Sequence, residues 1–333
     1  MTTQDLALDF HAADELEPGP TWQSWFDEFW PAYRRWFERA TTSSRPRYAE
    51  CLRALRTHMP EFVPVYERLT ELAGGGDTAA RFLSLYRPPP FLSGCSQAVF
   101  TGGPTALVRN YDYAPRLCDG IVLRSAWCGV RTIATTDCLI GALDGLNEHG
   151  LAVALAFGGR RSVGDGFGIP IVVRYVLETC ADVPSAVAAL TRIPVHMAYN
   201  VTLADRDGRQ ASVFVGPDRP ARAQPIGMCT NHQEDVVWPE HAARTHTVER
   251  EEFLRSCLAD STLTLPDLVD RFLTPPLFRR DYARGSGTLY TLVLYPADGV
   301  AEYRWPDHGW RLSFERFPQR GYVAHYRETR ALR

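Results

Sequence analysis

The first ninety residues carry hydrophobic and polar positions at helical spacing. Tryptophan, phenylalanine and tyrosine recur every three or four residues between positions 22 and 37, with charged residues between them. This pattern indicates a helix that packs its aromatic face on a core, and the alternative is that this face lines a ligand groove. Further helices are predicted over 47–57 and 61–73, and three glycines then end the second of these. Residues 1–87 are therefore expected to be helical.

Beyond the proline run at 88–90 the spacing changes to that of strands. Helices are predicted over 170–193 and 241–272, and an Asp-Gly turn is expected in each of the last two hairpins. Because groups of strands alternate with groups of helices, the order favours antiparallel sheets covered by helices over a doubly wound parallel sheet. The expected strands span 95–100, 106–113, 120–127, 131–137, 139–143, 151–157, 199–205, 210–215, 288–295 and 301–305.

Composition excludes several classes of protein. The chain has 333 residues, 45% of them hydrophobic and 23% charged, with a formal net charge of −3. This balance does not favour a nucleic-acid or membrane partner. The chain contains 36 arginines and no lysine. The absence of lysine excludes a phosphate-binding loop that ends in Gly-Lys-Ser/Thr, a lysine Schiff base and a Ser-x-x-Lys hydrolase.

The eight cysteines do not form a metal-binding pattern. No Cys-x-x-Cys pair occurs, and none of the cysteines lies near a closely spaced histidine pair, so we expect neither a zinc site nor another metal. The first residues lack the basic start and apolar stretch of a signal peptide, and the apolar runs are too short to span a bilayer. The sequence predicts a cytoplasmic protein with reduced thiols and no cofactor.

Gly94 and Cys95 stand where the helical part meets the first predicted strand. A cysteine at a strand start is usually a small buried residue, whereas a nucleophilic cysteine needs a base and an oxyanion hole. No histidine is close in sequence. If the peptide bond after Gly94 is cut, the new α-amino group of Cys95, with a reference pKa of about 7.7–8.0, can serve as the base for its own thiol. Both interpretations are open at this point.

Five short motifs follow one another from this cysteine: GCS at 94–96, RNYDY at 109–113, GLNEHGL at 145–151, YN at 199–200 and TLYT at 288–291. Together they resemble the N-terminal nucleophile hydrolases, in the branch of acyl-coenzyme A:6-aminopenicillanic acid acyltransferase and choloylglycine hydrolase. The resemblance covers residues 95 to about 305. It implies an α+β fold, a four-layer αββα sandwich of two antiparallel sheets flanked by helices. It also implies a leader or small subunit over 1–94 and a catalytic core over 95–333.

The resemblance implies catalytic roles for four residues. Cys95 is expected to be the nucleophile, freed by self-cleavage after Gly94. Asp112 is expected to bind the new α-amino group, and Arg109 to lie beside the thiol and favour the thiolate. Asn200 is the expected oxyanion donor, because an amide donates without titrating. The alternative for Arg109 and Asp112 is a solvated pair on a strand.

Three further residues are expected, again by resemblance, to contact the substrate: Asn147, Tyr111 and Arg284. For Asn147 the alternative is a structural role in a turn, where asparagine is common. The leader is rich in aromatic residues and shows little likeness to that of the penicillin enzyme, so both the substrate pocket and the processing are expected to differ.

The function that these residues imply is an amide-bond enzyme. Cys95 would form an acyl-enzyme and pass the acyl group to a small amine or to water, and acyl-coenzyme A is a candidate co-substrate, for instance in secondary metabolism. One rival hypothesis is a Cys–His hydrolase that uses His149, His196 or His232. Another is an unprocessed, non-catalytic protein that binds an acyl compound. A small amine or amide is the expected partner, and a homo-oligomer stays open.

Overall fold

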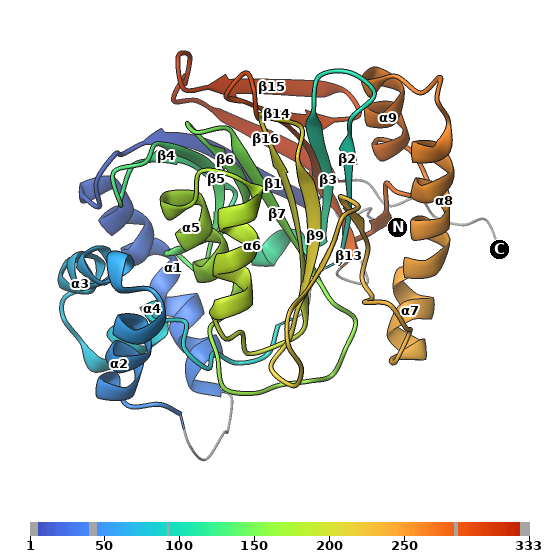
Figure 1. The fold of residues 1–333 in the computed structure, drawn as a ribbon. Coiled ribbons are helices and arrows are strands. Elements are labelled where there is room, and N and C mark those ends of the chain that lie inside the picture. Colours follow the sequence, from blue (N-terminus) through green and yellow to red (C-terminus); the bar gives the residue numbers. More distant parts are fainter. Residues whose placement is uncertain (1–5, 40–44, 92–93, 283–285, 327–333) are drawn as a thin grey trace, which may run out of the picture.

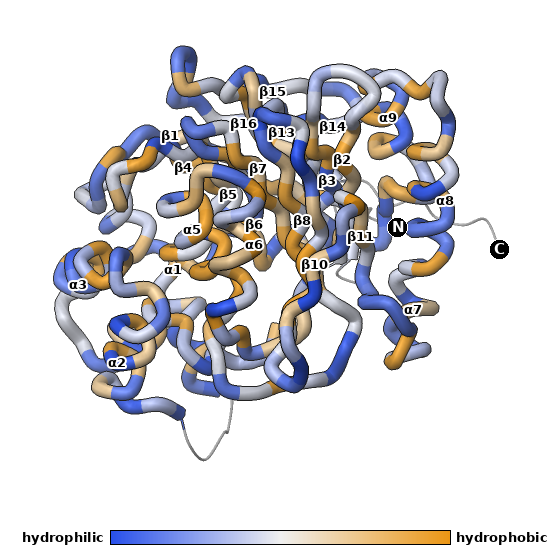
Figure 2. The backbone as a smooth tube through the Cα atoms, viewed as in Figure 1, coloured by the Kyte–Doolittle hydropathy of each residue, from blue (hydrophilic) through white to orange (hydrophobic). Residues whose placement is uncertain are grey.

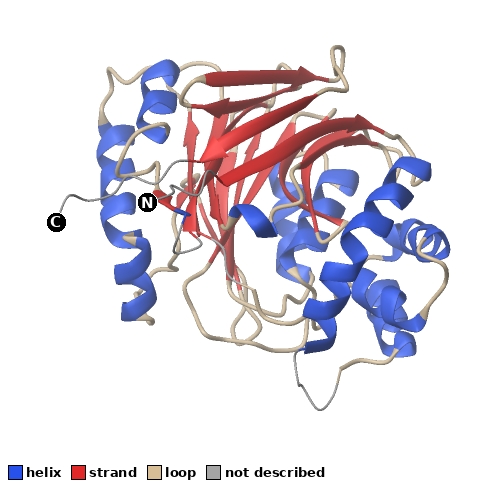
Figure 3. Ribbon diagram, turned by 180° about the vertical axis from the view of Figure 1, so that it is seen from behind, coloured by secondary structure: helices blue, strands red, loops and turns tan. Residues whose placement is uncertain are grey.

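Two β-sheets lie face to face in the middle of the molecule, and helices cover the outer face of each (Figures 1 and 3). The computed structural model describes residues 6–39, 45–91, 94–282 and 286–326. The predicted α+β sandwich, with helix, sheet, sheet and helix layers, is confirmed. Its interior is apolar, and Figure 2 shows hydrophobic residues along the central strands and the helices beside them.

The larger sheet has nine strands. All neighbouring strands run antiparallel except one parallel pair, β1 with β4. Helices α5 (Ile169–Thr179) and α6 (Val183–Arg192) cover its outer face. Across the sheet the strands are β10 (Arg222–Gln224), β9 (Gln210–Val215), β8 (Tyr199–Asp205), β7 (Leu151–Phe157), β6 (Gly141–Asn147), β5 (Thr132–Asp137), β4 (Ile121–Ser125), β1 (Leu6–Asp14) and β16 (Gly321–Tyr326).

The second sheet carries the first strand after the leader. Helices α7 (Pro239–Thr245), α8 (Thr247–Ala259) and α9 (Leu265–Phe272) lie on its outer side, where α8 contacts β2 and α9 contacts β3. Its strands, in order, are β11 (Met228–Cys229), β2 (Gly94–Phe100), β3 (Ala106–Tyr113), β13 (Ser286–Tyr295), β14 (Val300–Trp305) and β15 (His308–Ser313), with β12 (Arg280–Asp281) paired to β13.

The leader is not wholly helical, which corrects the expectation for residues 1–87. Strand β1 lies inside the nine-stranded sheet, between β4 and β16. The burial of its side chains alternates from one residue to the next, with Phe10 buried and Asp9 and His11 exposed, as is typical of a β-strand. The helices of the leader are α1 (Pro20–Arg39), α2 (Tyr48–His58), α3 (Val63–Leu72) and α4 (Asp77–Leu83), with a 3₁₀ turn η1 (Pro60–Phe62) between α2 and α3.

The leader is held to the core by specific contacts of α1. The indole Nε1 of Trp22 donates to the carbonyl of Leu139 at 2.8 Å, and the hydroxyl of Tyr33 accepts from the Cys138 amide at 3.0 Å. Cys138 and Leu139 both have left-handed backbone, with φ of 54° and 66°, which is costly for residues other than glycine. The aromatic face of α1 therefore holds a strained turn between β5 and β6.

Candidate functional site

Cys95 lies on β2 between the two sheets and has no exposed surface. In the antiparallel pairing of β2 with β3, Cys95 stands opposite Tyr111 and Gly94 opposite Asp112. Because side chains alternate along a strand, Cys95, Arg109 and Tyr111 share one face of the sheet, and Gly94 and Asp112 share the other. The hairpin that the sequence predicted thus brings the expected nucleophile, arginine and aspartate together on neighbouring strands.

The guanidinium of Arg109 connects the thiol to the opposite sheet. Its Nη2 donates to Cys95 Sγ at 3.3 Å and to the carbonyl of Leu155 at 2.9 Å. Its Nη1 forms an ion pair with Asp144, a carboxylate on β6 that also accepts a hydrogen bond of 2.8 Å from the Tyr290 hydroxyl. Both charged side chains of this pair are fully buried. Arg109 is therefore not a solvated strand residue, and Asp144 is a site residue that the sequence analysis missed.

The electrostatic environment of the thiol has opposing parts. Burial raises the pKa of Cys95, the positive charge of Arg109 lowers it, and the carboxylate of Asp112 raises it. The net direction is upward in the intact chain. The expected effect of Arg109 is present, but burial outweighs it, so the thiol form is favoured here.

Asp112 lies on the other face, beside the peptide bond that joins Gly94 to Cys95. Its Oδ1 accepts a hydrogen bond of 2.7 Å from Thr288, and its Oδ2 lies 3.5 Å from Arg250 without a hydrogen bond of its own. A Cβ added to Gly94 would stand only 2.9 Å from the Cβ of Asp112. Glycine is thus the residue that allows Asp112 to approach this peptide.

Arg250 and Asn231 complete the polar group around the backbone of Cys95. Arg250 on α8 donates to the carbonyl of Cys95 at 2.8 Å and to Ser96 Oγ at 2.7 Å. Asn231 Oδ1 accepts from the Cys95 amide at 3.0 Å and from Arg250 at 2.8 Å. These two residues follow Cys95 by 136 and 155 positions. Residues so far apart in sequence do not form a local motif, so the sequence alone did not identify Asn231 and Arg250 as site residues.

The structure assigns Asn200 a different contact from the expected one. Its amide nitrogen donates both hydrogens to main-chain carbonyls, at 2.9 Å to Thr230 and at 2.8 Å to His232. Both hydrogens of this amide are thus directed to main-chain oxygens, and neither to Cys95. Asn200 thereby fixes the two residues that flank Asn231, and its role as oxyanion donor stays a prediction.

The three residues expected to contact substrate differ in their surroundings. Asn147 is buried and donates to the carbonyls of Leu177 and Cys180, while its oxygen accepts from two main-chain amides of its own turn. Its side chain is thus fully used in the fold, as in the turn alternative, and a substrate contact of Asn147 stays a prediction. Tyr111 is buried with its ring 4.8 Å from the guanidinium of Arg109. Arg284 lies outside the described residues.

The histidines of the rival Cys–His hypothesis make other contacts. His232 bonds to Thr247 and lies 3.0 Å from Glu251. Burial lowers the pKa of His196 to about 4. In the described part of the chain, the hydrogen-bond partner of the Cys95 sulfur is Arg109, and none of His149, His196 and His232 bonds to it. The geometry does not support a Cys–His pair.

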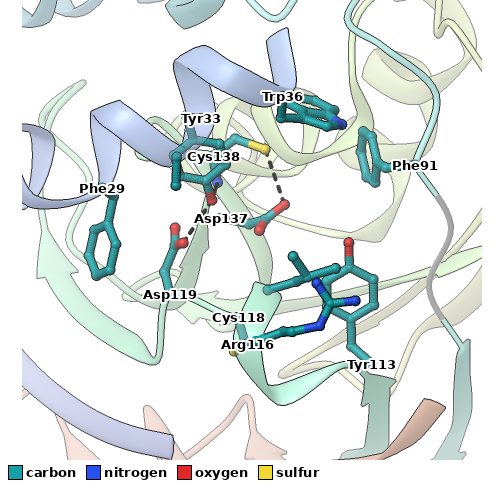
Figure 4. A pocket seen from close by; sticks show the side chains of 12 residues that line it. Phe29, Tyr33, Trp36, Phe91, Tyr113, Arg116, Cys118, Asp119, Asp137 and Cys138 are labelled. Atoms are coloured by element: carbon teal, nitrogen blue, oxygen red, sulfur yellow. Dashed lines mark hydrogen bonds between the residues drawn. The ribbon is translucent and has the colours of Figure 1, made fainter. Parts of the chain in front are cut away.

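A cavity of about 210 Å³ lies at the amino end of β2 (Figure 4). Helix α1 contributes one wall, and the 3₁₀ turn η2 (Pro115–Leu117) lies near its opposite side. The aromatic face of α1 thus packs on the core and also lines a cavity. The lining residues are Phe29, Ala32, Tyr33, Trp36, Phe91, Tyr113, Arg116, Leu117, Cys118, Asp119, Asp137 and Cys138.

Among the described residues there is neither a metal-binding cluster nor a membrane-spanning helix. No group of three or more histidine, cysteine or acidic side chains there could hold a metal ion. No helix in those residues is both long and apolar enough to cross a membrane.

Comparison with solved structures found similar chains at low sequence identity. Penicillin V acylase from Agrobacterium tumefaciens is 13% identical over 67% of this chain and 86% of its own, with a TM-score of 0.46. A mutant conjugated bile acid hydrolase from Clostridium perfringens is 13% identical over 72% of this chain and 99% of its own, with a TM-score of 0.46. An N-acylethanolamine-hydrolyzing acid amidase ortholog from Caenorhabditis elegans is 18% identical over 70% of this chain and 99% of its own, with a TM-score of 0.47.

Comparison with protein sequences gave two results. No curated protein matches the chain. A family profile described as acyl-coenzyme A:6-aminopenicillanic acid acyl-transferase matches residues 99–310. The match includes β3, β6, β8 and β13, the strands that carry Arg109, Asp144, Asn200 and Tyr290.

Proposed function

Because this chain belongs to the acyl-coenzyme A:6-aminopenicillanic acid acyl-transferase family of N-terminal nucleophile hydrolases, we propose that Cys95 is its nucleophile and that the chain activates itself by cleavage after Gly94. The chain is an enzyme of the acyltransferase or amide hydrolase type. The observation that carries the proposal is the double contact of Cys95. Arg109 donates to its sulfur at 3.3 Å, and Asn231 accepts from its main-chain nitrogen at 3.0 Å.

Self-cleavage uses the thiol and the carbonyl that precedes it. Cys95 Sγ attacks the carbonyl carbon of Gly94 while the thiol proton passes to the main-chain nitrogen of Cys95. The C–N bond then breaks, and the acyl group has moved from nitrogen to sulfur as a thioester. Water then hydrolyses the thioester to a carboxylate on Gly94 and a free thiol on Cys95, with a new α-amino group. Asp112 Oδ2 is buried without a hydrogen bond on the Gly94 side, which supports its proposed role of binding the resulting ammonium.

The freed α-amino group then works as the base for acyl transfer. It takes the proton of the Cys95 thiol, and the thiolate attacks the acyl carbonyl of the substrate. Asn231 Oδ1 accepts from the Cys95 amide and from Arg250, and its Nδ2 donates to the carbonyl of Phe157 at 3.2 Å in the uncleaved chain. We assign this Nδ2, in exchange for its bond to Phe157, as the oxyanion donor in place of Asn200, because Asn231 and not Asn200 is hydrogen bonded to Cys95. The α-ammonium returns its proton to the leaving amine, and an acceptor amine or water resolves the thioester.

Cleavage would leave residues 1–94 bound to 95–333 as a small subunit. Strand β1 is hydrogen bonded to β4 on one side and to β16 on the other, and Trp22 of α1 bonds to Leu139. The two products are therefore expected to co-purify under native conditions and to separate only when denatured.

The test is the intact mass and N-terminal sequence of the denatured protein. We expect two fragments, one beginning at Cys95, and a single uncleaved chain in Cys95→Ala. Cys257→Ala is the matched control, because this partly exposed thiol on α8 has no proposed role, and it should cleave like the wild type. Full activity in an uncleaved wild-type chain would overturn the proposal, and so would normal cleavage in Cys95→Ala.

A second measurement separates hydrolysis from transfer. The cleaved protein is incubated with an acyl-coenzyme A and a panel of small amines, and the products are identified by mass spectrometry. An N-acyl amine as the product assigns acyl transfer, and free acid alone assigns hydrolysis. Cys95→Ala should form neither product.

A further inference from the structure

Two buried carboxylates that the proposed acyl chemistry does not use, Asp119 and Asp137, line the cavity beside the site (Figure 4). They are only 9% and 8% exposed. Asp119 Oδ1 accepts from the Tyr33 hydroxyl at 2.7 Å, and Asp137 Oδ2 accepts from the Cys138 thiol at 3.3 Å. Asp119 Oδ2 is buried with no hydrogen-bond partner. Among the described residues neither carboxylate has an arginine or histidine within ion-pair distance, so their charge lacks a counter-ion.

The remaining walls of this cavity are mostly aromatic. Helix α1 contributes Phe29, Tyr33 and Trp36, while Phe91 precedes Gly94 by three positions and Tyr113 is the last residue of β3. The Trp36 ring lies 6.4 Å from Tyr33 and 6.2 Å from Phe91, centroid to centroid. Aromatic faces combined with carboxylates are the surroundings that organic ammonium ions prefer.

The lining of the cavity holds two acidic side chains and one basic side chain. Arg116 is the one basic side chain among its described lining residues, and it is exposed. Burial and then the charge of Asp137 raise the pKa of Asp119, while burial raises that of Asp137. The pair therefore retains a proton that a bound cation would displace. The Tyr33 hydroxyl, the Cys138 thiol and the Leu139 amide bond to the two carboxylates, and Arg109 acts on Asp137 at longer range. The remaining described titratable groups near them are Tyr111, Tyr113, Cys118 and Tyr199.

The cavity lies on the thiol side of the second sheet. Tyr113 lines it and follows Tyr111 by two positions on β3, so both rings are on the face that carries Cys95. The two rings are 5.6 Å apart. At about 210 Å³ the cavity is smaller than the roughly 300–1,000 Å³ typical of drug-sized ligands. It therefore suits a small group or one end of a substrate.

We propose that this cavity binds a small organic ammonium group, with Asp119 and Asp137 as its counter-ions and the surrounding aromatic rings as its walls. That the ammonium belongs to the amine half of the substrate rests on the proposed function. Binding itself does not rest on it, because a cation can occupy the cavity whether or not the chain cleaves itself or turns over.

The test compares choline with its uncharged isostere 3,3-dimethylbutan-1-ol by isothermal titration calorimetry on the wild-type protein. We expect choline to bind at least tenfold more tightly. Titrations in two buffers with different ionisation enthalpies should show net proton release on choline binding near neutral pH, as the shared proton is displaced. Equal affinities for the two probes would overturn the proposal, and so would the absence of binding of both choline and tetramethylammonium.

Variants show whether the binding takes place in this cavity. Asp119→Asn and Asp137→Asn keep the shape and remove a charge, so each should weaken choline binding at least tenfold and leave the alcohol unaffected. Trp36→Leu should weaken choline binding while it leaves both carboxylates in place. Asp235→Asn, at an exposed carboxylate outside the cavity, is the matched control and should bind like wild type. Unchanged choline affinity in all three cavity variants would overturn the assignment.

These outcomes are separable from those of the proposed function. Binding of choline by a protein that neither cleaves nor turns over would keep the ammonium site and overturn the acyl chemistry. Cleavage and turnover without ammonium binding would keep the acyl chemistry and overturn the ammonium site.

Discussion

Replacing Asp144 by asparagine removes one charge from the buried group that holds the Cys95 thiol. Asp144 forms an ion pair with Arg109, whose other terminal nitrogen lies 3.3 Å from the sulfur. Asparagine keeps the shape and an oxygen that can accept from Arg109 and Tyr290. The substitution therefore changes charge with little change in packing.

Two effects of opposite sign are expected from this substitution. Removal of one partner from a buried ion pair typically costs about 3–5 kcal/mol, and the retained hydrogen bonds place Asp144→Asn near the lower end, at about 3 kcal/mol. At the same time, the charge of Arg109 is no longer balanced by Asp144. The pKa of the Cys95 thiol should therefore fall, because the uncompensated guanidinium favours the thiolate.

Urea unfolding measures the first effect, and ultraviolet absorbance of the thiolate as a function of pH measures the second. Each titration is taken as a difference from the same protein with Cys95→Ser, so that the other seven cysteines and the tyrosines cancel. The expected result is a less stable protein whose Cys95 ionises at lower pH than in the wild type.

The chain offers a matched control in Arg174 and Glu178, a second buried arginine–carboxylate pair, 3.7 Å apart on α5. Glu178→Gln should also lower the free energy of unfolding, but it should leave the titration of Cys95 unchanged. The reasoning is refuted if Asp144→Asn leaves the thiol pKa unchanged or raises it, or if Glu178→Gln shifts it equally.

Gly94→Ala should slow fragment formation at least tenfold in a time course, because its Cβ would lie 2.9 Å from that of Asp112. Gly103→Ala, with its nearest neighbour at 3.6 Å, should cleave normally. Asn147→Ala leaves buried carbonyls and amides without partners, so urea unfolding should show a loss of about 3 kcal/mol. His196, with its pKa lowered to about 4 by burial, stays neutral in the fold while the unfolded chain takes up a proton. Stability should therefore fall as pH drops from about 6.5 to about 4, and His196→Gln should flatten that slope in urea unfolding.

Local patterning was enough to predict much of the fold. The hairpin of β2 and β3 and that of β8 and β9 need only alternating side chains and a short turn, so their strands were predicted close to their true bounds. The same hairpin carries Cys95, Arg109 and Asp112, and their proximity follows from its register. Strand β1 was missed because its alternation is short and precedes a long helical segment.

The rest of the site depends on contacts between residues that are far apart in the chain. Asn231 and Arg250 reach Cys95 only because β11 pairs with β2 and α8 packs on that sheet. Asp144 reaches Arg109 only because the two sheets face each other. Whether an asparagine binds a ligand or the main chain depends on which carbonyls folding buries beside it, as Asn200 illustrates. Local propensity is encoded in neighbouring residues, whereas the partner of a buried polar group is set by the packing of the whole chain.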